Sequence, residues 1–196
     1  LYLYIKKKIS NKNIIFFTPN HIIRWRTNTL ETQEAETIEW IKSFNKNTSE
    51  NIIFWDIGAN IGLYSIYAAS IFENVKVISF EPSTSNLRVL SRNISINKFE
   101  KKIFIFQIPL YDNENVFLQM NESKFIEGWS MHSFGTTKNF EGKTFIPENK
   151  YTIFGTSIND ILRNKILEIP NFIKIDVDGL EHLILNGASN YLSNPK

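Results

Sequence analysis

Residues 52–65 decide the fold of this chain, and they read Ile-Ile-Phe-Trp-Asp-Ile-Gly-Ala-Asn-Ile-Gly-Leu-Tyr-Ser. An apolar run with Asp56 near its end is followed by Gly58 and Gly62, with Asn60 between them, and then by an apolar segment. This pattern predicts a buried parallel strand, a tight turn and a helix. Glycines let such a turn approach a ligand closely, and the N–H groups that begin the helix favour an anionic group. Asp56 is expected at the carboxyl end of the strand, where open α/β sheets bind ligands.

The spacing within this turn narrows the class of ligand. It reads D-x-G-x-N-x-G, which matches neither the G-x-G-x-x-G fingerprint of dinucleotide-binding proteins nor a phosphate-binding loop with Gly-Lys-Ser/Thr. A second apolar strand is predicted over 75–80 and leads into Glu81, 25 residues after Asp56. An acid at that place binds ribose hydroxyls in nucleotide-binding sheets. A nucleoside ligand that needs no phosphate loop fits both features, and S-adenosylmethionine is such a ligand.

Strand and helix patterns alternate through most of the chain. The alternation predicts an open, mostly parallel sheet with helices on both faces. Right-handed crossovers place the carboxyl ends of the strands along one edge, so Asp56, Glu81 and Asp176 are expected to converge in one crevice. The predicted elements are a strand, turn and helix over 52–72, strands at 75–80, 103–108, 116–120 and 171–177, and helices that begin at Ser83, Ser157 and Gly179.

The first 50 residues are predicted to form an extension of their own. The β-rich runs 13–17 and 21–25 flank a turn at 18–20 and predict a small hairpin or lid, and a helix is predicted over 30–44. The expected organisation is therefore a hairpin and helix extension over 1–50 and an α/β domain over 51–196. Residues 121–149 are polar and contain glycine, so they are expected to form an excursion from the sheet.

The composition excludes several classes of protein. The chain has 196 residues, of which 42% are hydrophobic and 21% charged, as expected for one globular domain with a core. Its net charge is +2 without a block of like charges, so no nucleic-acid partner is expected. The absence of cysteine excludes disulfides and thiolate metal sites and fits a cytoplasmic location. No apolar run approaches the about 20 residues of a membrane-spanning helix.

Three stretches carry a resemblance to a known family. They are D-I-G-A-N-I-G-L-Y-S from Asp56, F-E-P-S-T-S-N-L-R-V-L-S-R-N-I from Phe80, and F-I-K-I-D-V-D-G-L-E-H-L-I-L-N-G-A from Phe172. In this order they closely resemble the FkbM family of S-adenosylmethionine-dependent methyltransferases, over roughly residues 51–190. A single glycine turn is a weak signal, whereas the ordered set is specific.

The resemblance implies a class I methyltransferase fold, which is a Rossmann-like open sheet, with S-adenosylmethionine as the methyl donor. It also implies transfer to a hydroxyl oxygen, so the expected partner is a small-molecule or glycan acceptor. The family often has an acid near the adenine, which points to Asp112, although a turn-forming aspartate explains the same residue. Enzymes of this class usually close the sheet with an antiparallel strand pair, so a chain that starts at Leu1 and stops at Lys196 is expected to be truncated before that pair. Two rival functions are a nucleoside-binding module without turnover and an NAD-linked enzyme.

The predicted cofactor residues surround the first two strand ends. Asp56 is expected to contact the methionyl amine directly or through another group, with a polar cap on the turn as the alternative. Gly58 and Gly62 allow close approach of a ligand, or simply of neighbouring elements. Asn60 is expected in a left-handed or ligand-facing position. Glu81 has two oxygens that can accept from both ribose hydroxyls, and its structural alternative is a solvated strand end.

The predicted catalytic residues lie around the last strand. Lys174 falls inside an apolar run and is costly to bury without a partner, so an ion pair with Asp176 or another acid is expected. Asp176, Asp178 and Glu181 allow three interpretations: a general base with a group that positions the substrate, a site for a hard cation such as Mg²⁺, or acids that stabilise a helix N-terminus. Asp176 or Glu181 is the expected base, no metal is expected, and His132 is a spare candidate for the base.

Overall fold

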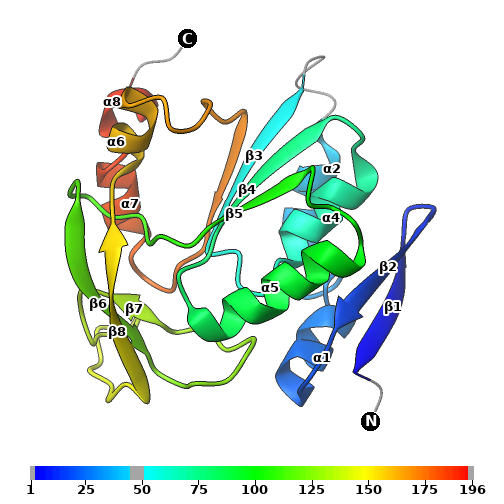
Figure 1. The fold of residues 1–196 in the computed structure, drawn as a ribbon, viewed down its shortest axis with the longest axis horizontal. Coiled ribbons are helices and arrows are strands. Elements are labelled where there is room, and N and C mark those ends of the chain that lie inside the picture. The colour runs from blue at the N-terminus through cyan, green and yellow to red at the C-terminus, as the bar shows by residue number, and fades with distance from the viewer. Residues whose placement is uncertain (1–2, 45–50, 194–196) are drawn as a thin grey trace.

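The centre of the protein is a four-stranded parallel sheet, seen in a computed structural model that describes residues 3–44 and 51–193 (Figure 1). The strand order is β5-β4-β3-β9. In its ladders, Ile57 pairs with Phe80 on one side and with Ile175 on the other, so three strands end level at one edge. The predicted open parallel sheet is therefore confirmed. The bounds are Ile52–Ile57 for β3, Val75–Phe80 for β4, Ile103–Phe106 for β5 and Phe172–Ile175 for β9.

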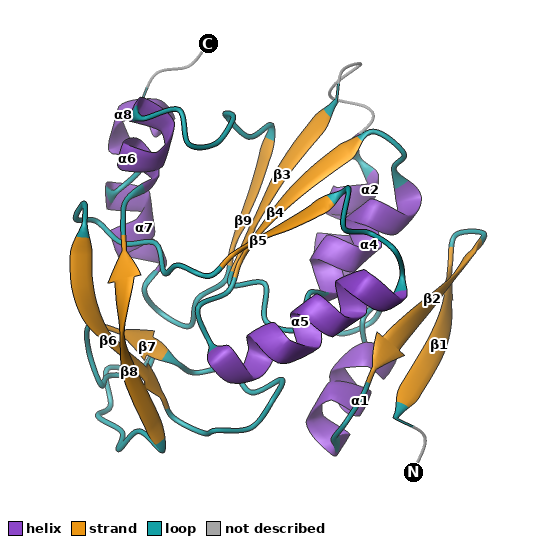
Figure 2. Ribbon diagram, viewed as in Figure 1, coloured by secondary structure: helices purple, strands orange, loops and turns teal. Residues whose placement is uncertain are grey.

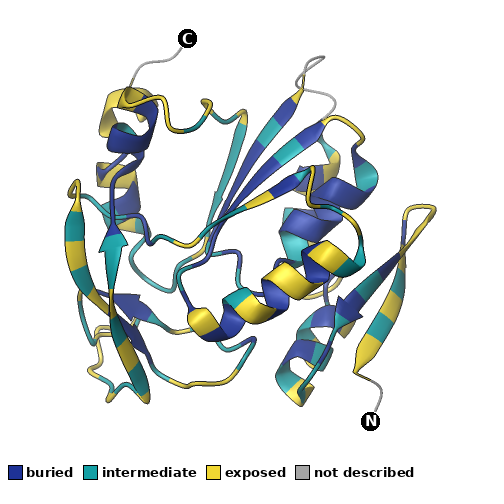
Figure 3. Cartoon of the chain, viewed as in Figure 1, coloured by how far each residue is buried: buried dark blue, intermediate teal, exposed yellow. Residues whose placement is uncertain are grey.

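Helices cover both faces of this sheet, as predicted (Figure 2). Side chains alternate along a strand, so Phe54 of β3 joins one core, whereas Trp55 and Ile57 join the other. All three are buried, because each face of the sheet is covered (Figure 3). The first core contains α2 (Ala35–Lys42), α4 (Leu63–Ile71) and α5 (Thr84–Ile96), and the second contains α6 (Ile158–Arg163) and α7 (Glu181–Asn186), which α8 (Ser189–Leu192) follows.

The N-terminal hairpin differs from the predicted one. It pairs β1 (Tyr4–Ile9) with β2 (Lys12–Phe17), and the predicted strand 21–25 is instead the start of helix α1 (His21–Asn28). Asn20, expected in a turn, caps this helix by accepting a hydrogen bond from the Ile23 N–H at 3.0 Å. Within the predicted helix 30–44, the structure forms α2. The predicted domain boundary lies within 45–50, outside the described residues.

Helix α5 holds the hairpin in place. Asn93 Oδ1 accepts from the Phe17 N–H at 2.8 Å, and Asn97 Oδ1 accepts from the Ile15 N–H at 2.9 Å. These amides satisfy backbone groups along the outer side of β2, which would otherwise be an open strand edge. The hairpin thereby fixes where the chain enters α1, which lies beside the hairpin (Figure 1).

A second sheet lies beside the carboxyl edge of the first. It is antiparallel with the order β7-β6-β8, formed by β6 (Val116–Glu122), β7 (Ser133–Phe134) and β8 (Asn149–Gly155). The predicted strand 116–120 therefore exists, but it belongs to this separate sheet. The predicted excursion 121–149 contains the short β7 and the loop between it and β8, while β8 itself was not predicted. None of the described helices is long and apolar enough to cross a lipid bilayer.

Candidate functional site

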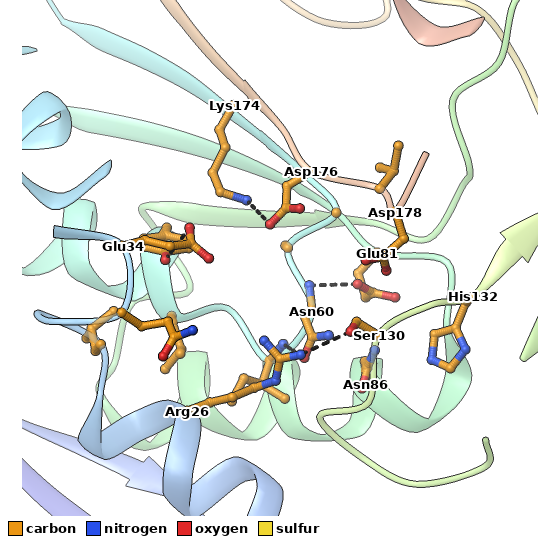
Figure 4. A pocket seen from close by; sticks show the side chains of 18 of the residues that line it. Arg26, Glu34, Asn60, Glu81, Asn86, Ser130, His132, Lys174, Asp176 and Asp178 are labelled. Carbon is orange, nitrogen blue, oxygen red and sulfur yellow. Dashed lines mark hydrogen bonds and ion pairs between the residues drawn. The ribbon is translucent and has the colours of Figure 1, made fainter. Parts of the chain in front are cut away.

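A cavity of about 330 Å³ opens at the carboxyl edge of β3, β4 and β9 (Figure 4). Its volume lies within the range of about 300–1,000 Å³ that is typical of small-molecule sites. Residues from three strand ends, far apart in the sequence, therefore share one hollow. The predicted site residues that line it are Gly58, Asn60, Glu81, Lys174 and Asp176. The predicted site residues that do not line it are Asp56, Gly62, Asp112 and Glu181.

Glu81 is the most deeply buried acid that lines the cavity, with 5% of its surface exposed. Its Oε2 accepts from the Asn60 N–H at 2.6 Å and its Oε1 from the Ser83 N–H at 2.8 Å, so it ties two turns together. Burial, and to a lesser extent the nearby Glu122, raises the pKa of Glu81 to about 7. Each carboxylate oxygen has two lone pairs, so each can still accept a further hydrogen bond. Glu81 is thus a partly ionised acceptor at neutral pH, rather than a solvated strand end.

Asn60 joins the glycine turn to the loop that covers the cavity. Its backbone is left-handed, with φ of 51°, a conformation that asparagine adopts more readily than most residues. Its Nδ2 donates to the Trp129 carbonyl at 3.0 Å, and Asn86 Nδ2 donates to the same oxygen at 3.1 Å. Asn86 Oδ1 also accepts from the Gly128 N–H at 2.7 Å. Two buried or half-buried amides therefore hold residues 128–130 over the site.

Backbone conformation and, at Gly58, close packing explain the two glycines of the turn. Both have positive φ, +80° at Gly58 and +82° at Gly62, which side chains rarely tolerate. A Cβ on Gly58 would lie 1.9 Å from the Asp176 carbonyl oxygen, and one on Gly62 would lie 2.4 Å from Leu90 Cδ1. The backbone just after β9 approaches Gly58 closely, which supports the alternative considered from the sequence. At Gly62 the contact is with the end of a flexible leucine side chain, so the left-handed backbone is the stronger reason for glycine there. Gly58 nevertheless lines the cavity as well.

Asp56 lies beneath the cavity and is completely buried. Its Oδ2 accepts from Ser65 Oγ at 2.6 Å, and its Oδ1 lies 3.8 Å from Lys174 Nζ. Burial raises the pKa of Asp56, and the charge of Lys174 opposes this effect. Of the two predicted arrangements, direct contact with the methionyl amine or contact through another group, this position favours the second. Asp56 faces the site through Lys174.

Lys174 has the ion pairs that its apolar strand requires. Its side chain is only 9% exposed, and Nζ donates to Asp176 Oδ2 at 3.0 Å in addition to its pairing with Asp56. Nζ also lies 5.0 Å from the centre of the Tyr64 ring, within the range of a cation–π contact. Tyr64 in turn donates its hydroxyl to Glu34 Oε2 at 2.7 Å. The side chain of Asp176 is 54% exposed and is the open end of this network.

The other acids after β9 have different positions. Glu181 Oε1 accepts from the N–H groups of Val177 at 3.1 Å and Gly179 at 3.2 Å, so it closes its own turn and does not reach the cavity. This geometry favours the structural interpretation of Glu181 over a role as the base. Asp178 lines the cavity, and its Oδ2 accepts from the Met131 N–H at 2.5 Å. Asp112 contacts Asn113 and lies outside the cavity. Within 3–44 and 51–193, no group of three or more acids and histidines is arranged to hold a metal ion.

Several lining residues were not predicted from the sequence. Helix α1 contributes Trp25 and Arg26, and the segment after it contributes Glu34, so the N-terminal extension forms one wall of the cavity. No local signal identifies these residues, because they face the site only through the position of the hairpin. His132, a spare candidate in the sequence, also lines the cavity, and neither of its ring nitrogens has a hydrogen-bond partner among the described residues. Burial lowers the pKa of His132, which favours the neutral imidazole.

The cavity has groups that match the parts of an adenosyl sulfonium. Glu81 retains acceptor capacity for ribose hydroxyls, and Asp176 can attract an ammonium group. An apolar pocket lined in part by Pro82, Leu110 and Phe134 adjoins the cavity and shares His132 with it. Apolar side chains of this kind suit a flat ring system. The residues present therefore fit S-adenosylmethionine chemically.

Comparisons with known proteins find relatives that match part of the chain. Methyltransferase sdnD of Sordaria araneosa is 41% identical over 51 residues, which are 26% of this chain and 20% of that protein. The AMB antimetabolite synthetase AmbE of Pseudomonas aeruginosa is 39% identical over 59 residues, which are 30% of this chain and 3% of that protein. The solved structure of an S-adenosylmethionine-dependent methyltransferase from Agrobacterium tumefaciens is 14% identical, with a TM-score of 0.42 over 55% of this chain and 33% of that one. The chain thus spans a fifth or less of the two curated relatives.

A family-level match covers a larger part of the chain. The sequence profile of the Methyltransferase FkbM domain matches residues 56–196, which is more than half of the 196 residues. The matched range contains Asp56, the glycine turn, Glu81 and β9 with its acids. The chain therefore belongs to the FkbM methyltransferase domain family, whose methyl donor is S-adenosylmethionine.

Proposed function

We propose that this protein transfers a methyl group from S-adenosylmethionine to a hydroxyl oxygen of a small molecule or a sugar. The observation that carries the proposal is the shared cavity, in which Glu81 and Asp176 line one hollow from the ends of the two strands that flank β3. A hydroxyl group that attacks a methyl group loses its proton, so a proton acceptor is needed beside it. The half-exposed carboxylate of Asp176 is such an acceptor, and the neutral imidazole of His132 is a second one.

In this proposal each of the main cavity residues has a separate role. S-adenosylmethionine supplies an electrophilic methyl group on a sulfonium. Glu81 accepts hydrogen bonds from the ribose hydroxyls, and Asp176 accepts the proton of the acceptor hydroxyl. Lys174 holds Asp176 in place through its bond at 3.0 Å, while Asp56 anchors Lys174 from below. Such positioning contributes to rate because both reactants are held in the geometry of attack.

An acceptor panel tests the reaction. The full-length protein is expected to release S-adenosylhomocysteine with a sugar, phenol or aliphatic alcohol, because each carries a hydroxyl nucleophile. Asp176→Asn is expected to lower that rate about a hundredfold at saturating S-adenosylmethionine, the lower range of general-base contributions. Saturation separates this loss from any weakening of cofactor binding that follows when Asp176 no longer attracts the ammonium. Asp112→Asn is the matched control, because Asp112 lies outside the cavity. Methylation of RNA alone, or donor binding with no product from any hydroxyl acceptor, would contradict the proposal; the second result favours a binding module.

The affinity for S-adenosylhomocysteine is expected to rise about tenfold between pH 6 and pH 8. With a pKa of about 7, Glu81 is about one tenth ionised at pH 6 and about nine tenths ionised at pH 8. Ribose hydroxyls donate to the carboxylate form, so binding favours ionised Glu81 and strengthens as the pH rises. Isothermal titration calorimetry across this range measures the change.

Two variants separate Glu81 from the other titrating groups in that experiment. Glu81→Ala is expected to bind at least tenfold more weakly than wild type at pH 8 and to lose the rise with pH. Glu100→Ala removes an exposed glutamate outside the cavity and should reproduce the wild-type profile. An unchanged slope in Glu81→Ala would assign the titration to another group, such as Asp178 or His132.

A further inference from the structure

Arg26 enters the cavity from α1, on the side away from β9 (Figure 4). Its Nε donates to the Gly128 carbonyl at 2.7 Å and its Nη2 donates to Ser130 Oγ at 3.2 Å. A guanidinium group has five N–H donors, and these two bonds leave the N–H groups of Nη1 without a partner among the described residues. The side chain is therefore held in a fixed orientation, and the N–H groups of Nη1 remain able to donate to a ligand.

The two cations of the cavity differ in their pairing. Lys174 is neutralised by Asp56 and Asp176. Arg26, in contrast, takes part in none of the ion pairs between described residues. Its charge does act on Asp178, where it opposes the effect of burial on the pKa, but the Oδ2 of Asp178 already accepts from Met131. The α1 side of the cavity thus presents a guanidinium without a carboxylate in contact.

The cofactor has one part that matches this guanidinium. Its methionyl end carries an ammonium and a carboxylate, whereas its adenosyl end carries no negative charge. Acids on the β9 side, above all Asp176, attract the ammonium, and they repel the carboxylate toward the opposite wall. Arginine is the side chain best suited to hold a carboxylate, because its planar fork donates two parallel hydrogen bonds.

We propose that Arg26 binds the carboxylate of the methionyl end of S-adenosylmethionine. The inference rests on S-adenosylmethionine as the cofactor and adds a residue that lies before the stretch 56–196 matched by the family. It gives the N-terminal extension a function, since the hairpin on α5 sets the position of α1 and hence of Arg26. The competing explanation is that Arg26 only fastens residues 128–130 over the site through Gly128 and Ser130.

Calorimetry with three ligands distinguishes these explanations in the full-length protein. S-adenosylhomocysteine carries the carboxylate and the amine, its decarboxylated analogue carries only the amine, and methylthioadenosine carries neither. Arg26→Ala is expected to weaken S-adenosylhomocysteine about ten- to a hundredfold, the range of hydrogen bonds to charged groups, and to leave the other two within about twofold. Arg24→Ala removes the same charge from the same helix outside the cavity and should change none of the three affinities.

Arg26→Gln is a second, more conservative variant, which tests whether the loss of affinity in Arg26→Ala comes from misfolding. Its amide can still donate to the Gly128 carbonyl, while the charge and the fork are lost. The same selective loss of S-adenosylhomocysteine affinity is expected, and unchanged methylthioadenosine affinity shows that the site is folded. An equal loss for all three ligands, or no loss for S-adenosylhomocysteine, overturns the proposal. If the wild-type protein binds none of the three ligands, the cofactor assignment itself is wrong. This outcome is visible in the wild-type measurement alone, so it is distinct from a failure of the Arg26 proposal.

Discussion

Gly58→Ala is expected to destabilise the protein by roughly 2–5 kcal/mol, the sum of a left-handed backbone penalty and an overpacking penalty. The new Cβ would lie 1.9 Å from the carbonyl oxygen of Asp176 and 2.9 Å from its carbonyl carbon. These are backbone atoms, so no rotamer change relieves the overlap. The end of β9 has to move away from β3, and Lys174 and Asp176 move with it. Chemical denaturation of wild type and variant measures the loss.

Gly142→Ala is the matched control for the cost of placing a side chain on a left-handed backbone. Gly142 has a φ of +76°, close to the +80° of Gly58, but beyond its chain neighbours no atom lies within 4 Å of the position that a Cβ would take. Its substitution is therefore expected to cost only about 1–2 kcal/mol, the left-handed penalty by itself. If the two variants lose the same stability, contact with β9 is not the reason for a glycine at position 58.

The central sheet could be predicted because its signals are local. The run 52–57 is apolar, short and followed by a glycine turn, and each of these features depends only on neighbouring residues. Parallel strands end at a common edge, so the meeting of Glu81 and Asp176 follows from topology. The ion pair of Lys174 could also be predicted, since a lysine inside an apolar strand has few alternatives.

The features that were missed depend on tertiary structure. Residues 21–25 contain two isoleucines and a tryptophan, which suits a strand, but the Asn20 cap and the periodicity of buried Ile23 and Thr27 favour a helix. The direction of a side chain is not encoded locally either. Glu181 turns back onto the Val177 and Gly179 N–H groups, although its spacing alone equally allows it to face the cavity.

The walls of the site show the same limit on prediction. Arg26 and Trp25 face the cavity only because α5 holds the hairpin that precedes α1. The loop with His132 lies over the site through contacts with distant residues, among them the bonds that two asparagines donate to the Trp129 carbonyl. In both cases the contacts join residues more than 40 positions apart, so no pattern within a short window indicates them.

Lys174→Met is expected to destabilise the protein by about 3–5 kcal/mol at neutral pH, the usual cost of removing one member of a buried ion pair. Asp56 is completely buried, and Lys174 supplies its only ion pair among the described residues. Methionine fills a similar volume, so the loss comes from the uncompensated charge rather than from a void. Lys76→Met is the control, because Lys76 pairs with the exposed Glu168 at the surface and is expected to cost less than about 1 kcal/mol.

The pH dependence of this loss identifies its cause. Burial already raises the pKa of Asp56, and without the charge of Lys174 it rises further. In the folded variant Asp56 therefore keeps its proton to a higher pH than it does in the unfolded chain. The free energy of unfolding of the variant then falls as the pH rises between these two pKa values. The deficit of Lys174→Met relative to wild type is therefore expected to be larger at pH 8 than at pH 5. A deficit that is the same at both pH values indicates lost packing instead.

A double variant completes the test of this pair. Asp56→Asn removes the buried charge but keeps an acceptor for the Ser65 hydroxyl, which donates to Asp56 at 2.6 Å. Asp56→Asn combined with Lys174→Met is therefore expected to be more stable than Lys174→Met alone, with a coupling energy of about 1–3 kcal/mol between the two positions. Additive losses would mean that the two side chains act independently. In that case Lys174 is held in the cavity by Asp176 and Tyr64, and Asp56 has no part in positioning it.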